Sequence, residues 1–350
     1  MNKIEFLRAA KKAKGMSNKA FLKAILEERP DLKEKVNSGE VQPNFPGLGY
    51  SAYTVILGDE VFKTSQSETW PGVEVKDLIL GIERERNLLG YLNGTGLPVP
   101  ELTYVGKNFS FFGMKRLPGQ VLMRHDIQQM APDDKLRLAK EVAAFCADLS
   151  NAVPMDDAKE MGLDVSPAER MFNPEQIYAE FLNPDVKKAF GDRYDFFKQA
   201  IESYIDYHHE KYADGQQFLM HCDLKEGNLL WNPEMKELTG VIDFGLSHLT
   251  GLESGFKKIC EKYPADFVDM VLEEYSSLQS TQVTRKEIQL WACVEYVDYV
   301  LDELKSKKGH GYTREYADYV RAPLQLSSTP ETPASFLPSQ NSPSKTAPAF

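Results

Sequence analysis

The stretch from Phe218 to Ser247 constrains the fold of this 350-residue chain more than any other segment. It reads FLMHCDLKEGNLLWNPEMKELTGVIDFGLS, with Asp223 directly after an apolar run, Asn228 shortly after it and Asp243 inside VIDFG. Three oxygen-bearing side chains therefore lie in one short stretch. The rest of the chain is best understood as the framework that holds them.

The turn inside this stretch predicts how the three groups meet. Residues 229–231 and 238–242 are predicted strands, and Asn232-Pro233 opens the turn between them. Folding this hairpin brings Asn228 and Asp243 together at its open end. An amide oxygen beside a carboxylate makes an oxygen-only site, which suits Mg²⁺ because this ion takes its remaining ligands from water and phosphate.

Asp223 lies just upstream of this pair and can accept a proton from an attacking hydroxyl, as the base of a kinase catalytic loop does. An H-x-D or a D-F-G sequence alone also occurs by chance, with its aspartate capping a loop. Together and in this order, HCDLKEGN and VIDFG resemble the H-x-D-x-x-x-x-N and I-D-F-G pair of the kinase superfamily. GVIDFG is most similar to its aminoglycoside phosphotransferase and choline kinase branch.

The resemblance covers roughly residues 45–310 and implies an α+β, bilobal, protein-kinase-like fold. It implies a small N-lobe with an antiparallel sheet and one helix, then a larger, mainly helical C-lobe, with ATP in the cleft. Its implied activity is ATP- and Mg²⁺-dependent transfer of the γ-phosphate to a hydroxyl group. Asp223 would be the catalytic base, and Asn228 and Asp243 would hold the metal.

The segment PGLGYSAYTVILGDEVFKT favours a nucleotide-binding hairpin. Residues 53–57 and 60–63 are predicted strands around Gly58-Asp59, a strong two-residue turn signal. Gly47 and Gly49 just before them would let backbone amides approach phosphates, although a G-x-G alone is more often a simple turn. Lys63, at the end of the second strand, stands where kinases place a phosphate-binding lysine.

A helix predicted over residues 75–92 supports the role of that lysine. Its apolar stripe places Glu85 on the same inward face, where an unpaired charge is costly. We expect Glu85 to pair with Lys63, as in the ion pair that orients the kinase lysine. The alternative is that Glu85 reaches solvent at the edge of the stripe.

The segment MKRLPGQV follows a strand predicted near residues 109–114 and resembles the connector between the two lobes of the family. Backbone groups from Met114 to Arg116 would then face the adenine. Pro118-Gly119 otherwise indicates only a turn.

A helix predicted over residues 286–304 carries a candidate substrate surface. Glu295, Asp298 and Asp302 line one face together with Tyr299. Such a stripe is usually a solvated helix face. The resemblance favours the other interpretation, an acidic and aromatic wall for a small cationic substrate.

The overall charge narrows the choice of partners. The formal net charge is −11 and the isoelectric point is near 5.2, which argues against a general nucleic-acid-binding protein and favours a cationic substrate.

Four scattered cysteines without CxxC spacing indicate neither a zinc site nor a disulfide framework. No apolar run is long enough to span a membrane, so the sequence predicts a cytoplasmic protein, and nothing in it indicates an obligate protein partner.

We expect four segments along the chain. Residues 1–40 form a Lys-rich helical extension that packs on the N-lobe, for which an organelle presequence or a membrane-surface helix is the alternative. Residues 41–115 form the nucleotide-binding N-lobe, and residues 116–325 form the C-lobe with the catalytic and substrate-binding groups. Residues 326–350 are rich in Pro, Ser and Thr and are expected to be disordered.

Departures from the family pattern keep other functions open. Cys222 replaces the glycine of H-G-D, and Lys225-Glu226 replaces His-Pro. Lys225 follows Asp223 as in serine/threonine protein kinases, where this lysine touches the transferred phosphate, so we also predict a catalytic role for it. The chain is therefore expected to phosphorylate a small molecule, with a protein or effector-type kinase as the alternative and an inactive kinase-like binding module as the third.

Overall fold

The computed structural model of the chain describes residues 17–46, 52–65, 75–107, 111–163, 173–211 and 216–306. The predictions for residues 1–16, for Gly47 and Gly49, and for the tail at 326–350 lie outside these ranges. The described part combines antiparallel sheets with a larger number of helices, which confirms the predicted α+β class. No helix in these ranges is both long and apolar enough to cross a membrane.

The N-lobe is built on a four-stranded antiparallel sheet with the order β1-β2-β4-β3. Its strands are β1 (Ala52–Leu57), β2 (Glu60–Ser65), β3 (Leu102–Val105) and β4 (Phe112–Lys115). The predicted hairpin is confirmed, since β1 pairs with β2 around a turn where Gly58 takes a left-handed φ of 66°. Helix α4 (Val75–Leu92), which contacts β2 and β3, has the predicted bounds.

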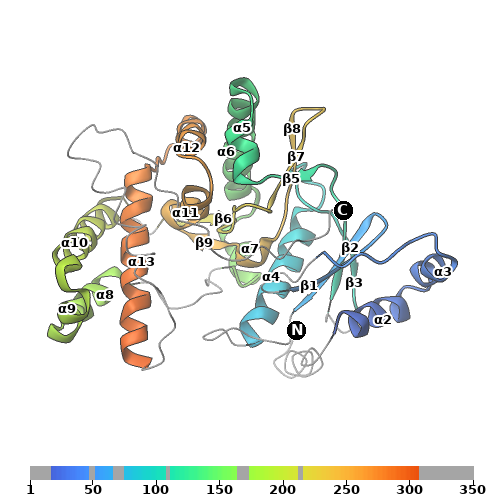
Figure 1. Cartoon of the computed structure of the whole chain (residues 1–350), viewed down its shortest axis with the longest axis horizontal. Coiled ribbons are helices and arrows are strands. Elements are labelled where there is room, and N and C mark those ends of the chain that lie inside the picture. The colour runs from blue at the N-terminus through green and yellow to red at the C-terminus, as the bar shows by residue number, and fades with distance from the viewer. Residues whose placement is uncertain are drawn as a thin grey trace, which may run out of the picture.

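Two N-terminal helices, α2 (Asn18–Glu28) and α3 (Pro30–Ser38), pack on this lobe (Figure 1). Phe21 and Ile25 of α2 and Leu32 of α3 are buried in one cluster with apolar residues of β1 and β2, among them Val55 and Phe62. The prediction that the N-terminal extension packs on the N-lobe is therefore confirmed for residues 18–38. In energetic terms these helices belong to the core of the N-lobe, because they cover side chains that would otherwise face water.

The chain passes between the lobes directly after β4. Strand β5 (Gln120–Val121) pairs with β7 (Leu229–Asn232), which pairs in turn with β8 (Glu237–Val241). A separate pair joins β6 (Phe218–Met220) to β9 (His248–Thr250). The connector and the hairpin predicted from the sequence are thus both present, with Ile242 just beyond the end of β8.

Around these strands lie the helices of the C-lobe: α5 (Arg124–Gln129), α6 (Pro132–Ala152), α7 (Met155–Glu160), α11 (Leu252–Lys262) and α12 (Ala265–Leu278). Helix α6 begins at Pro132, because a proline at the first helical position loses no hydrogen bond. Its apolar face packs against α12, β6 and β8. This main core runs from the N-lobe helix α4 to the C-lobe without interruption.

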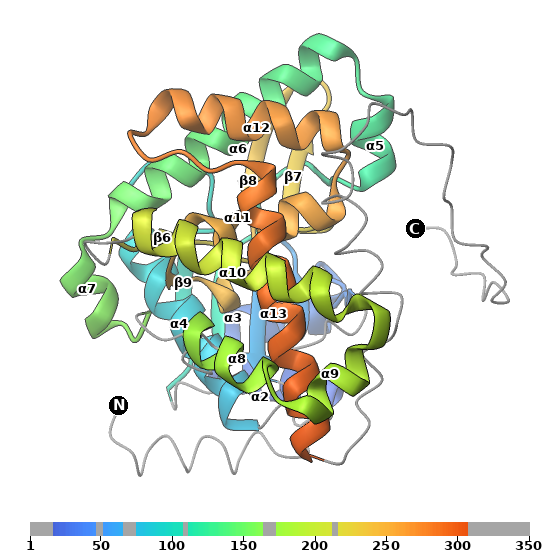
Figure 2. The same ribbon diagram turned by 90° about the vertical axis from the view of Figure 1, so that its left-hand side faces the viewer.

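A second group of helices forms its own apolar cluster beside the main core. It contains α8 (Pro174–Phe181), α9 (Pro184–Phe190), α10 (Tyr194–Lys211) and α13 (Arg285–Ser306). These helices lie on the side of the molecule opposite the N-lobe sheet (Figure 1), and α13 crosses α10 and packs against it (Figure 2). The whole is a small sheet lobe followed by a larger, mainly helical one.

Candidate active site

The loop after β6 carries the first group of candidate residues. Cys222 takes a left-handed φ of 59°, so the backbone turns sharply just before Asp223. Asn228 closes the loop from the other side, because its Nδ2 donates hydrogen bonds to the backbone oxygen of Asp223 at 2.8 Å and to its Oδ2 at 3.2 Å. The sequence spacing thus folds the carboxylate and the amide against each other.

The base of the β7–β8 hairpin brings Asp243 to the same place. Leu229 pairs with Val241, and the amide of Ile242 donates to the backbone oxygen of Asn228 at 3.0 Å. The predicted convergence of Asn228 and Asp243 at the open end is therefore confirmed. Asp243 has a left-handed φ of 71°, which turns the chain out of the strand at this residue.

Lys63 and Glu85 form the ion pair expected from the sequence. The Nζ atom of Lys63 lies 2.8 and 2.7 Å from the two carboxylate oxygens of Glu85, and their side chains are 8% and 1% exposed. The alternative in which Glu85 reaches solvent is therefore wrong. Glu85 Oε1 also accepts a hydrogen bond from the amide of Phe244 at 3.3 Å, which links α4 to the turn after Asp243.

The same ammonium group also reaches the hairpin, since Lys63 Nζ lies 2.9 Å from Asp243 Oδ1. Burial opposes the charge on Lys63, but the carboxylates of Asp243 and Glu85 outweigh burial and raise the pKa of Lys63. Lys63 in turn lowers the pKa of Asp243 to about 2. One cation from the N-lobe thus holds an ionised carboxylate of the C-lobe.

Asp223 is shielded from water and has a cation of its own. Its Oδ2 lies 2.6 Å from Lys225 Nζ, and the side chains of Asp223 and Lys225 are 5% and 36% exposed. Burial raises the pKa of Asp223, against the opposing effect of Lys225. A carboxylate with a raised pKa is a better proton acceptor, which suits a general base.

Asn228 and Asp243 provide the ligand chemistry that Mg²⁺ requires. The Nδ2 atom of Asn228 is used toward Asp223, so its oxygen lies on the other side of the amide, and Asp243 is ionised. No group of three or more His, Cys, Asp or Glu side chains in the described ranges forms a metal cluster. Two oxygen donors suffice for Mg²⁺, because phosphate and water complete its coordination.

His221 is a structural residue of the site that the motif analysis did not single out. Its Nδ1 accepts a hydrogen bond from the amide of Asp223 at 3.3 Å, and its Nε2 lies 3.1 Å from the backbone oxygen of Ile242. Its ring also packs on Phe244 and on Phe145 of α6. His221 therefore ties the loop of Asp223 to the strand end at Asp243, and the first letter of H-x-D was the signal for it.

A sequence model of the phosphotransferase enzyme family (APH) matches residues 73–283, more than half of the chain. The chain belongs to this family. Like the family, it is a kinase-type phosphotransferase that acts on hydroxyl groups. No curated protein matches it in sequence.

Solved structures of other phosphotransferases share the fold. The GDP complex of aminoglycoside 2'-phosphotransferase-IIIa has a TM-score of 0.67 at 22% identity, covering 89% of this chain and 98% of that chain. The streptomycin-ATP complex of APH(2")-IIa gives 0.51 at 17%, covering 85% and 96%. Macrolide 2'-phosphotransferase MphH from Brachybacterium faecium gives 0.54 at 16%, covering 87% and 100%. At these identities the similarity establishes the fold alone.

The sequence predicts nucleotide contacts in two segments, around Gly47 and Gly49 and in the connector. Gly47 and Gly49 lie outside the described residues. In the connector, backbone groups from Met114 to Arg116 are expected to face the adenine, and two of their amides are bonded within the N-lobe. The amide of Lys115 donates to Glu101 O at 2.8 Å, and that of Arg116 donates to Asp59 O at 2.7 Å, because the N-lobe sheet and its hairpin turn use them.

Met114 lies within β4, paired with both β2 and β3, and its side chain is buried in the main core. The contact of the connector backbone with a nucleotide stays a prediction.

The residues of the predicted acidic wall on α13 make contacts within the protein. Glu295 contacts Lys257, a buried lysine of α11 that also lies 3.4 Å from Glu261. Glu295 therefore already has a cation partner within the protein, and its role toward a substrate stays a prediction. The sequence could not show this, because the periodicity of α13 gives its faces but does not identify the cation opposite.

The other three residues of that stripe, Asp298, Tyr299 and Asp302, are half-buried on α13 and interact with other parts of the chain. They lie on the helix that packs against α10 and α11. Their role toward a substrate stays a prediction.

Proposed function

We propose that this phosphotransferase moves the γ-phosphate of ATP to a hydroxyl group of a small, cationic molecule in the presence of Mg²⁺. The observation that carries the proposal is the position of Lys63. It binds Glu85 and Asp243 together, beside the loop in which Asn228 contacts Asp223. This arrangement joins a phosphate-binding cation, two metal ligands and a base at one place.

Each residue then has a role in the transfer. Lys63 orients the α and β phosphates, with Glu85 holding it in position. Asn228 and Asp243 hold Mg²⁺, which neutralises charge on the phosphate oxygens when it is bound. Gly47 and Gly49 are proposed to approach the phosphates through their amides, and the carbonyl groups of Met114 and Arg116 to approach the adenine.

Asp223 acts on the acceptor. The acceptor oxygen forms a bond to the γ-phosphorus as the bond from that phosphorus to the bridging oxygen of ADP breaks, and the hydroxyl proton passes to Asp223. Lys225, which pairs with Asp223 at 2.6 Å, is close enough to the base to neutralise the phosphoryl group during the transfer. The buried setting of Asp223 favours this proton transfer because it raises the pKa of the carboxylate.

The formal charge of −11 supports a cationic acceptor, and Asp298, Tyr299 and Asp302 are the proposed contacts on the chain. Solved structures of the same fold contain kanamycin in one case and streptomycin with ATP in another. These two antibiotics are amines rich in hydroxyl groups, so they belong to the class that the charge favours.

Phosphorylation of a protein is the second candidate, and the Lys225–Asp223 pair is the observation that favours it, because protein kinases carry a lysine at this position. An inactive binding module is disfavoured, since Lys63, Glu85, Asp223, Asn228 and Asp243 are present and lie together.

A coupled assay for ADP release separates these functions. Kanamycin, streptomycin, choline, a neutral sugar and casein would be tested with ATP and Mg²⁺ at two salt concentrations. We expect turnover with a cationic hydroxyl compound and a KM that rises with salt, because screening weakens attraction between charges. Turnover of casein or the neutral sugar alone would contradict the proposal, as would a KM that ignores salt.

A further inference from the structure

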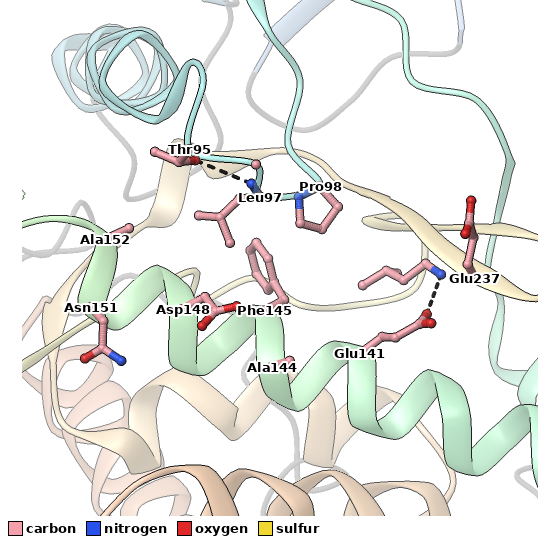
Figure 3. A pocket seen from close by; sticks show the side chains of 12 residues that line it. Thr95, Leu97, Pro98, Glu141, Ala144, Phe145, Asp148, Asn151, Ala152 and Glu237 are labelled. Atoms are coloured by element: carbon pink, nitrogen blue, oxygen red, sulfur yellow. Dashed lines mark hydrogen bonds between the residues drawn. The ribbon is translucent and has the colours of Figure 1, made fainter.

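A pocket of about 750 Å³ lies at the junction of the two lobes, apart from the residues proposed for catalysis (Figure 3). One wall is the loop from Thr95 to Pro98, which connects α4 to β3 in the N-lobe. The other walls are α6 and the beginning of β8, which belong to the C-lobe. Lys63, Glu85, Asp223, Asn228 and Asp243 do not line it.

The lining combines apolar surface with negative charge. Its apolar side chains are those of Leu97, Pro98, Ala144, Phe145, Ala152 and Leu238. Glu141, Asp148 and Glu237 add carboxylates, and none of the described residues that line the pocket is basic. The lysines next to these residues in sequence are directed elsewhere, since Lys140 lies 3.8 Å from Glu274 and Lys236 lies 3.0 Å from Asp134.

The carboxylates gain from a cation in the pocket. Glu141 Oε2 accepts a hydrogen bond from the amide of Leu238 at 2.5 Å, which fixes this side chain on the wall (Figure 3). Partial burial raises the pKa of Glu141, while the hydrogen bond from Leu238 and the charge of Arg137 oppose this increase, and the negative charge of Glu237 adds to it. A positive group placed between Glu141 and Glu237 would offset the repulsion between the two carboxylates.

We propose that this pocket is a second ligand site, which binds a small organic cation with an apolar body. The volume falls in the range of about 300–1,000 Å³ that is typical of sites for such molecules. The apolar side chains of the walls supply contact area for the body of the ligand, and the carboxylates select its positive charge. This site is distinct from the acceptor site and does not depend on the proposed reaction.

The pocket is in contact with the catalytic centre through one aromatic ring. Figure 3 shows the Phe145 ring pointing from α6 toward Leu97 and Pro98. The centroid of the same ring lies 6.3 Å from that of Phe244, which follows Asp243, and 6.4 Å from that of His221. A ligand in the pocket therefore packs on a side chain that supports both catalytic segments.

The backbone provides a second connection. The amide of Val241 donates to the oxygen of Pro98 at 2.7 Å, so the N-lobe wall of the pocket is bonded to the strand that leads to Asp243. A ligand that bridges the two walls changes how the lobes close on a nucleotide. The affinities of the two ligands must then depend on each other by the same factor.

Calorimetry with tryptamine tests the site directly. Tryptamine is an aromatic amine without a hydroxyl group, so it cannot accept phosphate on oxygen, and N-acetyltryptamine is its uncharged counterpart. We expect tryptamine to bind the full chain in low salt and N-acetyltryptamine to bind at least about tenfold more weakly, a difference of about 1.4 kcal/mol. Equal binding of the two compounds, or no binding of tryptamine at millimolar concentration, would overturn the proposal.

Variants locate the binding site. Ala144→Trp fills the pocket from α6, and the pair Asp148→Asn with Glu237→Gln removes charge without adding bulk. Both should weaken tryptamine binding at least about tenfold, whereas Asp133→Asn, an exposed change on α6 away from the pocket, should leave it unchanged. The melting temperature shows whether the charge variant is folded. If the folded charge variant binds tryptamine as tightly as the unaltered chain does, the assignment is wrong.

A last measurement separates this site from other sites and other ligands. The affinity for ADP should change when tryptamine is saturating, and the affinity for tryptamine should change by the same factor when ADP is saturating. Unchanged affinities would refute the coupling through Phe145. Binding of a Lys-rich peptide but not of tryptamine would show a protein-docking surface and would contradict the small-molecule site.

Discussion

At Lys63, one ammonium group serves two carboxylates that come from distant parts of the chain. Glu85 is almost completely buried, whereas the Asp243 side chain keeps about a third of its surface in water (34%). Removal of the lysine therefore affects the two partners differently. Glu85 becomes a buried charge without a partner, while Asp243 is still solvated in part.

We predict that Lys63→Met lowers the free energy of unfolding by about 3–5 kcal/mol, the cost of breaking a buried ion pair from one side. The double variant Lys63→Met with Glu85→Leu should recover much of this loss, because it leaves no buried charge. Chemical denaturation measures the free energy of unfolding of both variants. Lys115→Met, at an exposed position of β4, is the control. A Lys63→Met protein as stable as the control would contradict the buried pair.

His221 predicts how stability depends on pH. Burial lowers its pKa from the ordinary 6.5 to about 4 in the folded protein. The unfolded chain therefore binds this proton at a higher pH than the folded one, so the stability it contributes is complete above about pH 6.5 and is lost as the pH falls toward 4. The full loss is about 3 kcal/mol, at 1.36 kcal/mol for each pKa unit.

The measurement is the free energy of unfolding at several pH values, in the unaltered chain and in His221→Gln. The glutamine keeps a donor and an acceptor but does not titrate, so its stability should fall less between pH 7 and pH 4.5. Parallel curves for the two proteins would show that His221 is not held neutral by burial.

Some residues of the site could be predicted from the sequence and others could not. The pairing of Lys63 with Glu85 was predictable, because a charge on an apolar helix face needs a partner. Lys63 lies in a predicted strand that precedes this helix. The left-handed backbone of Cys222 was indicated only by the glycine that the family often has there. The third contact of Lys63, to Asp243, depends on how the two lobes close, and no local pattern encodes it.

On the scale of elements, α2 and the N-lobe sheet depend on each other. Phe21 is fully buried against β1 and β2, and its ring lies edge-on to Phe111 with centroids 5.8 Å apart. The same cluster includes Phe62, the neighbour of Lys63 in β2. The packing of α2 therefore supports the strand that carries Lys63, the lysine proposed to bind phosphate.

Phe21→Ala should lower the free energy of unfolding by about 3–5 kcal/mol, the usual cost of emptying a phenylalanine site in a core. Lys19→Ala, at an exposed position of the same helix, should change it by no more than about 0.5 kcal/mol. Thermal and chemical unfolding measure both, and ADP affinity should fall in the first variant alone. If deletion of the Phe21 ring costs no more than the change at Lys19, α2 is not part of the N-lobe core.

The positions of helices and strands along the chain were more predictable than the elements against which they pack. The β7–β8 hairpin and α4 follow from short-range turn signals and helical periodicity, which the sequence contains. The packing partner of α13 does not follow from such local signals. Lys257 of α11 contacts Glu295 of α13, and no sequence pattern predicted that these two helices meet. The bonding of the connector amides of Lys115 and Arg116 could not be predicted for a related reason, because their acceptors Glu101 and Asp59 lie outside the segment.

At the scale of the whole molecule, the proposed site residues come from different parts of the protein. Lys63 and Glu85 lie in the N-lobe, Asp223, Asn228 and Asp243 lie at the ends of the central strands, and the proposed substrate contacts lie on α13. The main core runs through both lobes, whereas α8, α9, α10 and α13 form a separate cluster. Such a division allows the helical group to determine the acceptor while the catalytic groups stay the same.

The turnover of Asp223→Asn tests the central claim most directly. Asparagine retains an oxygen that can accept the hydrogen bond from Asn228, but it cannot take a proton, so the fold and ADP binding should persist. We predict a fall in turnover of about 10²–10⁴-fold, with a melting temperature and an ADP affinity close to those of the unaltered chain. A folded Asp223→Asn protein that binds ADP and turns over at the full rate would contradict the mechanism.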